Sequence, residues 1–314
     1  MARFVTRRLL QMAAMLVAIS LVTFFLFIVA LPSGNPASLL AGRLATPAEI
    51  HLISVRYGFD KPRYIQYLHT MKNIFTGQAY SYSQNFNVLS EIKDGLPATL
   101  SLAFGAGFFW LATSIALGTL AAVRSGKYID RVLTVLSMIG VSMPPFLLGA
   151  ALIYFIGYKL GWIPLQGYVN ITHPASWFWH LLAPWLTLSV LFIGFYSRVL
   201  RGTILDTMGE DYVRTARAKG LSERKVLVRH ILRTSLLPII SLWGLDMAQV
   251  IGGGAILTET VYNLHGVGQL AASAIGNFDI ITLMCIVMLL ALSVVVMGAL
   301  IDIMYAVLDP RIRL

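Results

Sequence analysis

Long apolar runs, separated by shorter polar segments, fill most of the chain. A helix needs about 20 mostly apolar residues to cross the roughly 30 Å hydrocarbon layer of a membrane, because unpaired backbone polar groups are not tolerated in lipid. Six stretches satisfy this condition, and they cover residues 9–31, 97–123, 132–158, 178–199, 236–257 and 280–308. The pattern therefore predicts an all-α, multi-pass membrane protein with six transmembrane helices.

The composition supports a membrane location. Of the 314 residues, 57% are hydrophobic and only 12% are charged, whereas about a quarter of the residues are charged in a typical soluble domain. The first apolar stretch follows Arg3, Arg7 and Arg8, as a signal peptide would, but it is about twice as long as a signal-peptide core and no small-x-small cleavage site follows. We therefore expect an uncleaved first span within residues 1–31.

The net charge of +10 first suggests a nucleic-acid partner, but the positions of the basic residues favour another explanation. Membrane proteins concentrate Lys and Arg in their cytoplasmic connections. If the N-terminus is cytoplasmic, 17 of the 24 Lys and Arg residues lie on that side, namely Arg3, Arg7, Arg8, Arg124, Lys127, Arg131, Arg198, Arg201, Arg214, Arg217, Lys219, Arg224, Lys225, Arg229, Arg233, Arg311 and Arg313. We therefore expect both termini in the cytoplasm, a lipid membrane as the surrounding partner and no nucleic acid.

Two segments between the predicted spans are long enough to fold outside the membrane. The outer one begins with helix breakers from Pro32 to Pro36 and is then predicted to be helical over 47–55 and 62–75. The inner one separates the fourth and fifth spans. The expected organisation is an N-terminal tail and first span (1–31), an external helical segment (32–96), a five-helix core (97–308) that includes an inner loop (201–235), and a cytoplasmic tail (309–314).

The inner loop is predicted to contain two short helices that meet at a bend. The first covers residues 211–219 and ends at Gly220, which suits a left-handed C-terminal cap. Ser222, with Glu223 directly after it, is suited to cap the second helix.

One face of the first helix is small or uncharged, with Asp211, Thr215 and Ala218 flanked by Tyr212 and Ala216. Such a face leaves room for close contact with another protein. The alternative is a basic, solvated loop that touches anionic lipid, but a lipid-binding helix normally carries large apolar anchors.

Charged or polar residues within the predicted spans are candidates for function, because charges are costly in a membrane. Asp246 lies near the middle of the fifth span with Gln249 on the next turn, so it is placed to meet a peptide amino group or a metal ion; a structural partner in a neighbouring subunit is the alternative. Glu259, at the outer end of that span, either helps to form an outer gate or simply reaches water. Ser142 is a further candidate for the solute path, and Asp302 is interpreted as a structural partner of an arginine.

The sequence lacks the signatures of a membrane enzyme. There is no His-Glu-x-x-His motif, the six histidines are scattered, Ser142 has no His or Lys in its span to activate it, and Cys285 has no second cysteine to pair with. The phosphate-binding motif G-x-x-x-x-G-K-[ST] is also missing. We predict that the chain is not an enzyme and that it binds no metal or cofactor itself.

Several motifs together resemble the membrane subunits of ABC importers, in the branch formed by dipeptide, oligopeptide and nickel permeases. The inner segment EDYVRTARAKGLSERKVLVRHILRTSLLP is similar to the cytoplasmic EAA loop of these proteins, with Arg214-Thr215-Ala216 in place of Glu-Ala-Ala. Further similar motifs extend over nearly the whole chain: the start MARFVTRR, GFDKP at 58–62, PATL at 97–100, GVSMP at 140–144, ILTE at 256–259, GVG at 266–268 and LDPR at 308–311.

The resemblance implies a type I ABC importer permease fold in a prokaryotic plasma (inner) membrane, and binding-protein-dependent peptide transport. It implies that the first inner-loop helix couples to a separate ATPase through Asp211, Tyr212, Arg214, Thr215, Ala216, Arg217, Lys219 and Gly220. The implied partners are a second homologous permease subunit, two ABC ATPase subunits that bind ATP and Mg, and an external substrate-binding protein.

The motifs do not distinguish a peptide from nickel or glutathione as the transported solute. Peptide is favoured because no predicted span holds a cluster of His or Met residues suited to nickel. A free-standing secondary transporter is the other alternative, since such proteins also use polar residues and broken helices near mid-membrane. It would be expected to show internal repeats or more spans.

Overall fold

The computed structural model describes residues 2–29, 36–41 and 45–308. These residues are mostly helical, and the β-type feature among them is an isolated antiparallel bridge between Tyr80 and Asn87. The predicted all-α fold is therefore confirmed. The predicted tail 309–314 lies outside the described residues, as does the side chain of Asp302.

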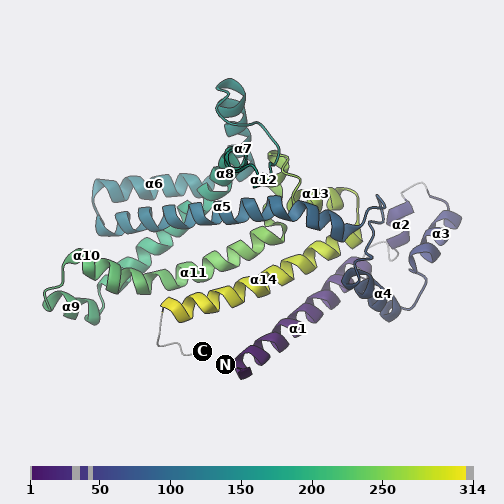
Figure 1. Ribbon diagram of the computed structural model, residues 1–314, viewed down its shortest axis with the longest axis horizontal. Helices are drawn as coiled ribbons and strands as arrows, with labels where there is room; N and C mark the ends of the chain where they lie inside the picture. Colours follow the sequence, from purple (N-terminus) through teal and green to yellow (C-terminus); the bar gives the residue numbers. More distant parts are fainter. Residues whose placement is uncertain (1, 30–35, 42–44, 309–314) are drawn as a thin grey trace.

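Within the described residues, four helices are long and apolar enough to cross a membrane. They are α5 (Val88–Val123), α8 (Pro174–Met208), the continuous helix Glu223–Gly254 and α14 (Ile280–Leu308). The continuous helix contains α10 (Glu223–Val226), α11 (Leu232–Gln249) and the π-helical turns η3 (Leu227–Ile231) and η4 (Val250–Gly254). In the bundle α5 packs along α8, and α11 packs along α14 (Figure 1).

Large apolar side chains fill the interior between α5, α8 and α11. Trp110 of α5 is fully buried and stacks on Phe192 of α8, with ring centroids 4.3 Å apart. Tyr196, one turn further along α8, and Met247 of α11 are also fully buried. This core fixes the position of α11 relative to α8, which matters for the sites described below.

The third predicted span is not one straight helix. It consists of α6 (Tyr128–Ser142) and, after a break at Met143 and Pro144, of α7 (Pro145–Leu152) with the π-helical turn η2 (Ile153–Lys159). The two halves are bent by 96°, and α7 projects away from the bundle in Figure 1. Two consecutive prolines explain the break, because proline has no N–H to continue the helix and forces the preceding residue into an extended conformation.

Judged by length and composition alone, the described helices provide fewer spans than the six predicted. The bent pair raises the four long helices to five if it counts as one span. The first predicted span is formed by α1 (Ala2–Phe24) and the π-helical turn η1 (Phe25–Val29), and its apolar part, Ala13–Val29, is a shorter helix that packs beside α14. Six spans therefore stay a prediction.

The glycine run at 252–254 permits both close helix contact and a local break in the helix. At Gly252 a Cβ atom would lie 2.3 Å from Cδ1 of Leu290, so the close packing of this turn on α14 requires glycine. Gly253 has a φ of 105°, which interrupts the helical path within η4. The continuous helix therefore ends in a kinked turn directly before α12 (Ile256–Val261).

The described part of the segment predicted to be external contains the helices α2 (Pro36–Ala41), α3 (Pro47–Tyr57) and α4 (Arg63–Phe75), which confirms the two helices predicted there. Thr46 and Glu49 form a capping box at the start of α3, and the hydrogen bonds from Thr46 lower the pKa of Glu49. Met71 and Ile74 of α4 pack with Cys285 of α14 in one buried cluster. Cys285, which has no second cysteine to pair with, therefore contributes to this packing.

Candidate functional site

The helix α9 (Asp211–Ala218) lies with α10 at one end of the molecule, and α2, α3 and α4 lie at the opposite end (Figure 1). The chain leaves the bundle at the end of α8 and returns at Glu223, so 14 residues, 209–222, form the protruding connection. The predicted inner loop, 201–235, also includes the end of α8 and the start of α11, and the second of its two predicted short helices is the start of the continuous helix Glu223–Gly254. Gly220 has a φ of 76°, as predicted for the left-handed residue at the bend.

Two faces of α9 differ in exposure. Val213 and Ala216 are buried against a cluster that includes Leu200 and Ile204 of α8 and Val226 of α10. The remaining predicted coupling residues are mostly exposed, namely Asp211, Tyr212, Arg214, Thr215, Lys219 and Gly220, with Arg217 half-buried. Ala216 therefore anchors α9 to its own chain, while the opposite face is free to meet another protein.

An ion pair fixes the bend between α9 and α10. Arg217 donates hydrogen bonds to both carboxylate oxygens of Glu223, with Nε 3.0 Å from Oε1 and Nη2 3.3 Å from Oε2. Ser222 occupies the N-cap position of α10, but its side chain forms no capping hydrogen bond. The predicted capping role of the Ser222 side chain is wrong, and Glu223 acts across the bend instead.

Hydrogen bonds tie the adjoining parts of α8 and α11 together. Ser235 donates from Oγ to Oγ1 of Thr207 over 3.1 Å and to the backbone oxygen of Thr203 over 3.3 Å. Thr203 in turn donates from Oγ1 to the backbone oxygen of Ser235. These bonds join α8 and α11 on either side of the connection that carries α9.

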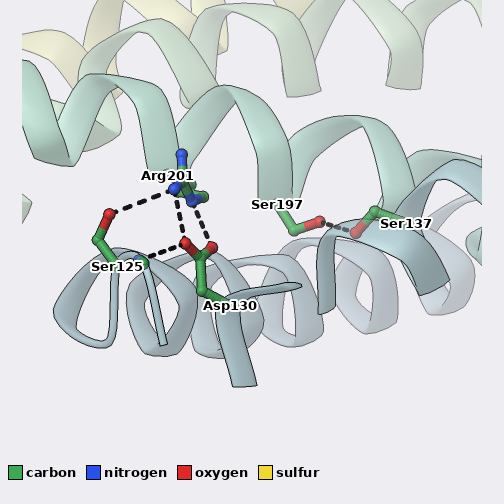
Figure 2. Close-up of polar contacts among 6 residues, drawn as sticks. Ser125, Asp130, Ser137, Ser197 and Arg201 are labelled. Carbon is green, nitrogen blue, oxygen red and sulfur yellow. Dashed lines mark hydrogen bonds and ion pairs between the residues drawn. The ribbon is translucent and has the colours of Figure 1, made fainter. Parts of the chain in front are cut away.

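A second ion pair lies near the same end and was missed by the sequence analysis (Figure 2). Arg201 of α8 donates from Nε to Oδ1 of Asp130 over 2.6 Å and from Nη2 to Oδ2 over 2.7 Å. Asp130 also accepts from the backbone N–H of Gly126, and Arg201 reaches Oγ of Ser125. The pair fastens the turn between α5 and α6 to α8.

Asp246 on α11 faces α8 and accepts a hydrogen bond from the Tyr196 hydroxyl over 2.5 Å. Asp246 is half-buried, whereas Gln249, one turn further, is exposed. The Asp246 carboxylate is thus oriented by a fully buried tyrosine and keeps part of its surface open. The sequence pattern placed Asp246 and Gln249 together but could not reveal Tyr196.

Glu259 on α12 is fully buried and does not reach water. Its carboxylate accepts hydrogen bonds from Oγ1 of Thr99 over 2.8 Å and from the backbone N–H of Gln269 over 3.0 Å. The first backbone N–H of α13 (Val267–Gly276), that of Val267, donates to Thr99. Glu259 and Thr99 therefore cap the N-terminus of α13 from two other helices.

The structure does not bring the four predicted solute-path residues together. Asp246 and Gln249 share one face of α11, and Glu259 is enclosed between α5, α12 and α13. Ser142 is exposed at the end of α6, a helix that packs on α5 and α8, and its hydroxyl donates to the backbone oxygen of Met138. Among the described residues no group of three or more His, Cys, Asp or Glu side chains could hold a metal ion.

Comparison with known proteins identifies relatives over the full length. A family model described as a binding-protein-dependent transport system inner membrane component matches residues 114–314, and a model for the N-terminal part of such components matches residues 1–103. A probable peptide ABC transporter permease protein, y4tP, of Sinorhizobium fredii is 36% identical over 315 residues, covering 100% of both chains. The glutathione transport system permease protein GsiC of Escherichia coli is 33% identical over 314 residues, covering 100% of this chain and 99% of GsiC.

A solved structure shares the fold. The inward-facing MetNI methionine ABC transporter contains a chain that matches with a TM-score of 0.55 and 20% sequence identity. The match covers 70% of this chain and 97% of the other.

Proposed function

We propose a function from one premise: the chain belongs to the family of binding-protein-dependent transport system inner membrane components. Members of this family are membrane subunits of ABC importers. The chain is therefore a multi-pass transport subunit of an inner membrane and not an enzyme. Its substrate, its partners and the roles of its residues form the proposal that follows.

The transported solute is a di- or oligopeptide that an external binding protein delivers. Support comes from two related proteins, one from Sinorhizobium fredii and one from Brucella abortus. The names of both proteins describe peptide transport, and this chain matches each of them over its whole length. Glutathione, itself a tripeptide, is the second candidate, because GsiC is 33% identical. Both solutes present an amino group and carboxylates, so the same path chemistry serves either.

The complete importer contains this chain, a second homologous permease subunit, two ATPase subunits that bind ATP and Mg, and the binding protein. Six spans with both termini in the cytoplasm fit this assembly. Two observations support the orientation: α9 and the external helices lie at opposite ends of the molecule, and α9 carries the basic residues expected on the cytoplasmic side (Figure 1). α1 supplies the first span despite its short apolar part.

The observation that carries the coupling proposal is the two-faced helix α9. One face is locked to α8 and α10 by Val213, Ala216 and the Arg217–Glu223 pair, and the other is exposed and small enough for close docking. In this proposal the exposed face sits in a cleft of an ATPase subunit. When the ATPase subunits close on ATP, α9 moves with them and carries the ends of α8 and α11 as a unit.

Within the membrane, Asp246 is the group that meets the amino terminus of the peptide. Tyr196 holds the carboxylate in place, and the exposed Gln249 one turn away offers an amide to the peptide backbone. The kink at Gly253 lies between this pair and Glu259. Glu259 acts as a structural support of the outer end, where it joins α12, α13 and α5.

The test is uptake of labelled Ala-Phe into proteoliposomes that contain the whole importer and enclosed ATP. The proposal predicts ATP-dependent uptake that requires the binding protein. Uptake that persists without ATP and without ATPase subunits would contradict it and would favour a free-standing secondary transporter.

A further inference from the structure

A polar cavity in the external segment has no role in the transport cycle described above. It has a volume of about 360 Å³ and lies between the end of α3, one side of α4 and residues 78–82, with Ile28 of η1 at its base. Charged and amide side chains, among them Arg56, Lys61 and Gln66, line it together with the aromatic rings of Tyr57, Phe59 and Tyr82.

The charged side chains that line this cavity have one sign. Arg56 and Lys61 line it, and no Asp or Glu does. Within the described ranges neither cation forms an ion pair, although Arg56 also lies over the ring of Tyr57, 5.6 Å from its centroid. An anion that enters the cavity therefore meets two cations and no carboxylate in its lining; the Asp279 carboxylate lies behind the wall, where it accepts a hydrogen bond from the backbone N–H of Tyr82 over 3.3 Å.

Hydrogen bonds and ring packing hold the walls of the cavity in place. Gln66 is buried and donates from Nε2 to the backbone oxygens of Phe59 and Lys61, over 3.0 and 2.7 Å, which fixes the loop that carries Lys61. Tyr57, Phe59 and Tyr82 pack on one another with ring centroids 4.6 to 6.1 Å apart. The cationic groups are thus presented beside a preformed aromatic surface.

We propose that this cavity binds a small solute with a free carboxylate and an apolar or aromatic part, of about the size of a dipeptide. The volume falls in the range of small-molecule sites and is much larger than the single acidic side chain of a docked protein would fill. Lys61 and Arg56 hold the carboxylate, and the tyrosine rings contact the side chain. The inference rests on the proposed function in one respect, because it takes this segment to face the outside.

Binding of N-acetyl-Ala-Phe and of its C-terminal amide to the purified complex in nanodiscs tests the proposal, by equilibrium dialysis without ATP or binding protein. The acetyl group removes the amino group that Asp246 is proposed to meet, so binding in the membrane path does not contribute. The acid is expected to bind at least about tenfold more tightly than the amide, and Lys61→Gln or Arg56→Gln should weaken binding of the acid by roughly tenfold.

Lys72→Gln is the matched control, because Lys72 is an exposed cation on α4 that does not line the cavity. It should change the affinity less than about twofold. Equal affinity for acid and amide, no measurable binding, or an equal loss in Lys72→Gln and Lys61→Gln would overturn the proposal. Uptake of Ala-Phe by the whole importer is a separate readout. A failure of the binding prediction is therefore distinguished from a failure of the transport function.

Discussion

Arg217 and Glu223 face each other across the bend at Gly220, and the guanidinium spans both carboxylate oxygens. Because both side chains are substantially exposed, the pair adds only about 0.2–1 kcal/mol to the free energy of unfolding. Its importance is geometric. In the proposed coupling mechanism it sets the angle between α9 and the continuous helix Glu223–Gly254, and thus how motion of α9 would reach the membrane.

Breaking this pair should uncouple the importer without unfolding it. Glu223→Gln is expected to lower peptide-stimulated ATP hydrolysis roughly fivefold, equivalent to about 1 kcal/mol, while the thermal denaturation midpoint stays close to wild type. The double variant Arg217→Glu with Glu223→Arg restores a pair of opposite charges and should recover most of the stimulation. A double variant as defective as the single one would show that the pair does not set the geometry.

The Asp130–Arg201 pair should matter for stability, because the Asp130 side chain is only 6% exposed and that of Arg201 29% (Figure 2). Asp130→Asn leaves the guanidinium without its charged partner and is expected to cost about 2 kcal/mol. Ser197→Ala is the comparison: it removes the neutral hydrogen bond with Ser137, worth about 1 kcal/mol. Thermal denaturation of the purified complex measures both, and equal midpoints for the two variants would contradict the assignment.

The enclosed Glu259 carboxylate predicts a steric effect at a neighbouring glycine. A Cβ atom at Gly266 would lie 2.4 Å from Oε2 of Glu259, whereas a Cβ at Gly276, at the other end of α13, would meet nothing within 4 Å. Gly266→Ala should therefore destabilise the protein by about 1–3 kcal/mol, and Gly276→Ala should be neutral or slightly stabilising. Thermal denaturation midpoints of the two variants decide this, and a Gly266→Ala variant as stable as wild type would mean that Glu259 lies elsewhere.

The proposed role of Asp246 predicts a dependence on the amino terminus of the solute. Asp246→Asn should lower the uptake of Ala-Phe about tenfold, because an amide lacks the charge that pairs with an ammonium group. Tyr196→Phe is the second variant, because it keeps the Asp246 charge but removes the hydroxyl that orients the carboxylate, and we expect a smaller loss. Equal losses in both variants at unchanged stability would assign Asp246 a structural role instead.

Local signals in the sequence predicted local structure well. The start of α9 at Asp211, the left-handed bend at Gly220 and the two external helices after Pro47 and Pro62 all follow from capping residues and helix breakers close in sequence. The adjacent Pro144 and Pro145 within an apolar run also indicate the helix break after Ser142. The length of the run nevertheless favoured a single span. The bend of 96° shows that two adjacent prolines outweigh apolar length.

Contacts between distant segments could not be predicted in the same way. Asp130 and Arg201 are 71 residues apart, and Thr99 and Glu259 are 160 apart. The sequence around each of these residues does not specify its partner, because the pairing depends on how α5, α6, α8 and α13 pack. Glu259 was expected to form an outer gate or to reach water, and its burial follows from the arrival of the α13 N-terminus, which supplies backbone N–H groups for the charge.

Peptide-stimulated ATP hydrolysis by the complete importer tests the central claim most directly when wild type is compared with Thr215→Trp. Thr215 lies on the exposed face of α9, and its hydroxyl donates to the backbone oxygen of Asp211 within the same helix, so the bulky side chain is expected to block docking without disturbing the fold. Thr76→Trp, an exposed threonine at the end of α4, is the control. We predict loss of stimulation in Thr215→Trp alone; undiminished stimulation in that variant would contradict the account of α9 as the coupling helix.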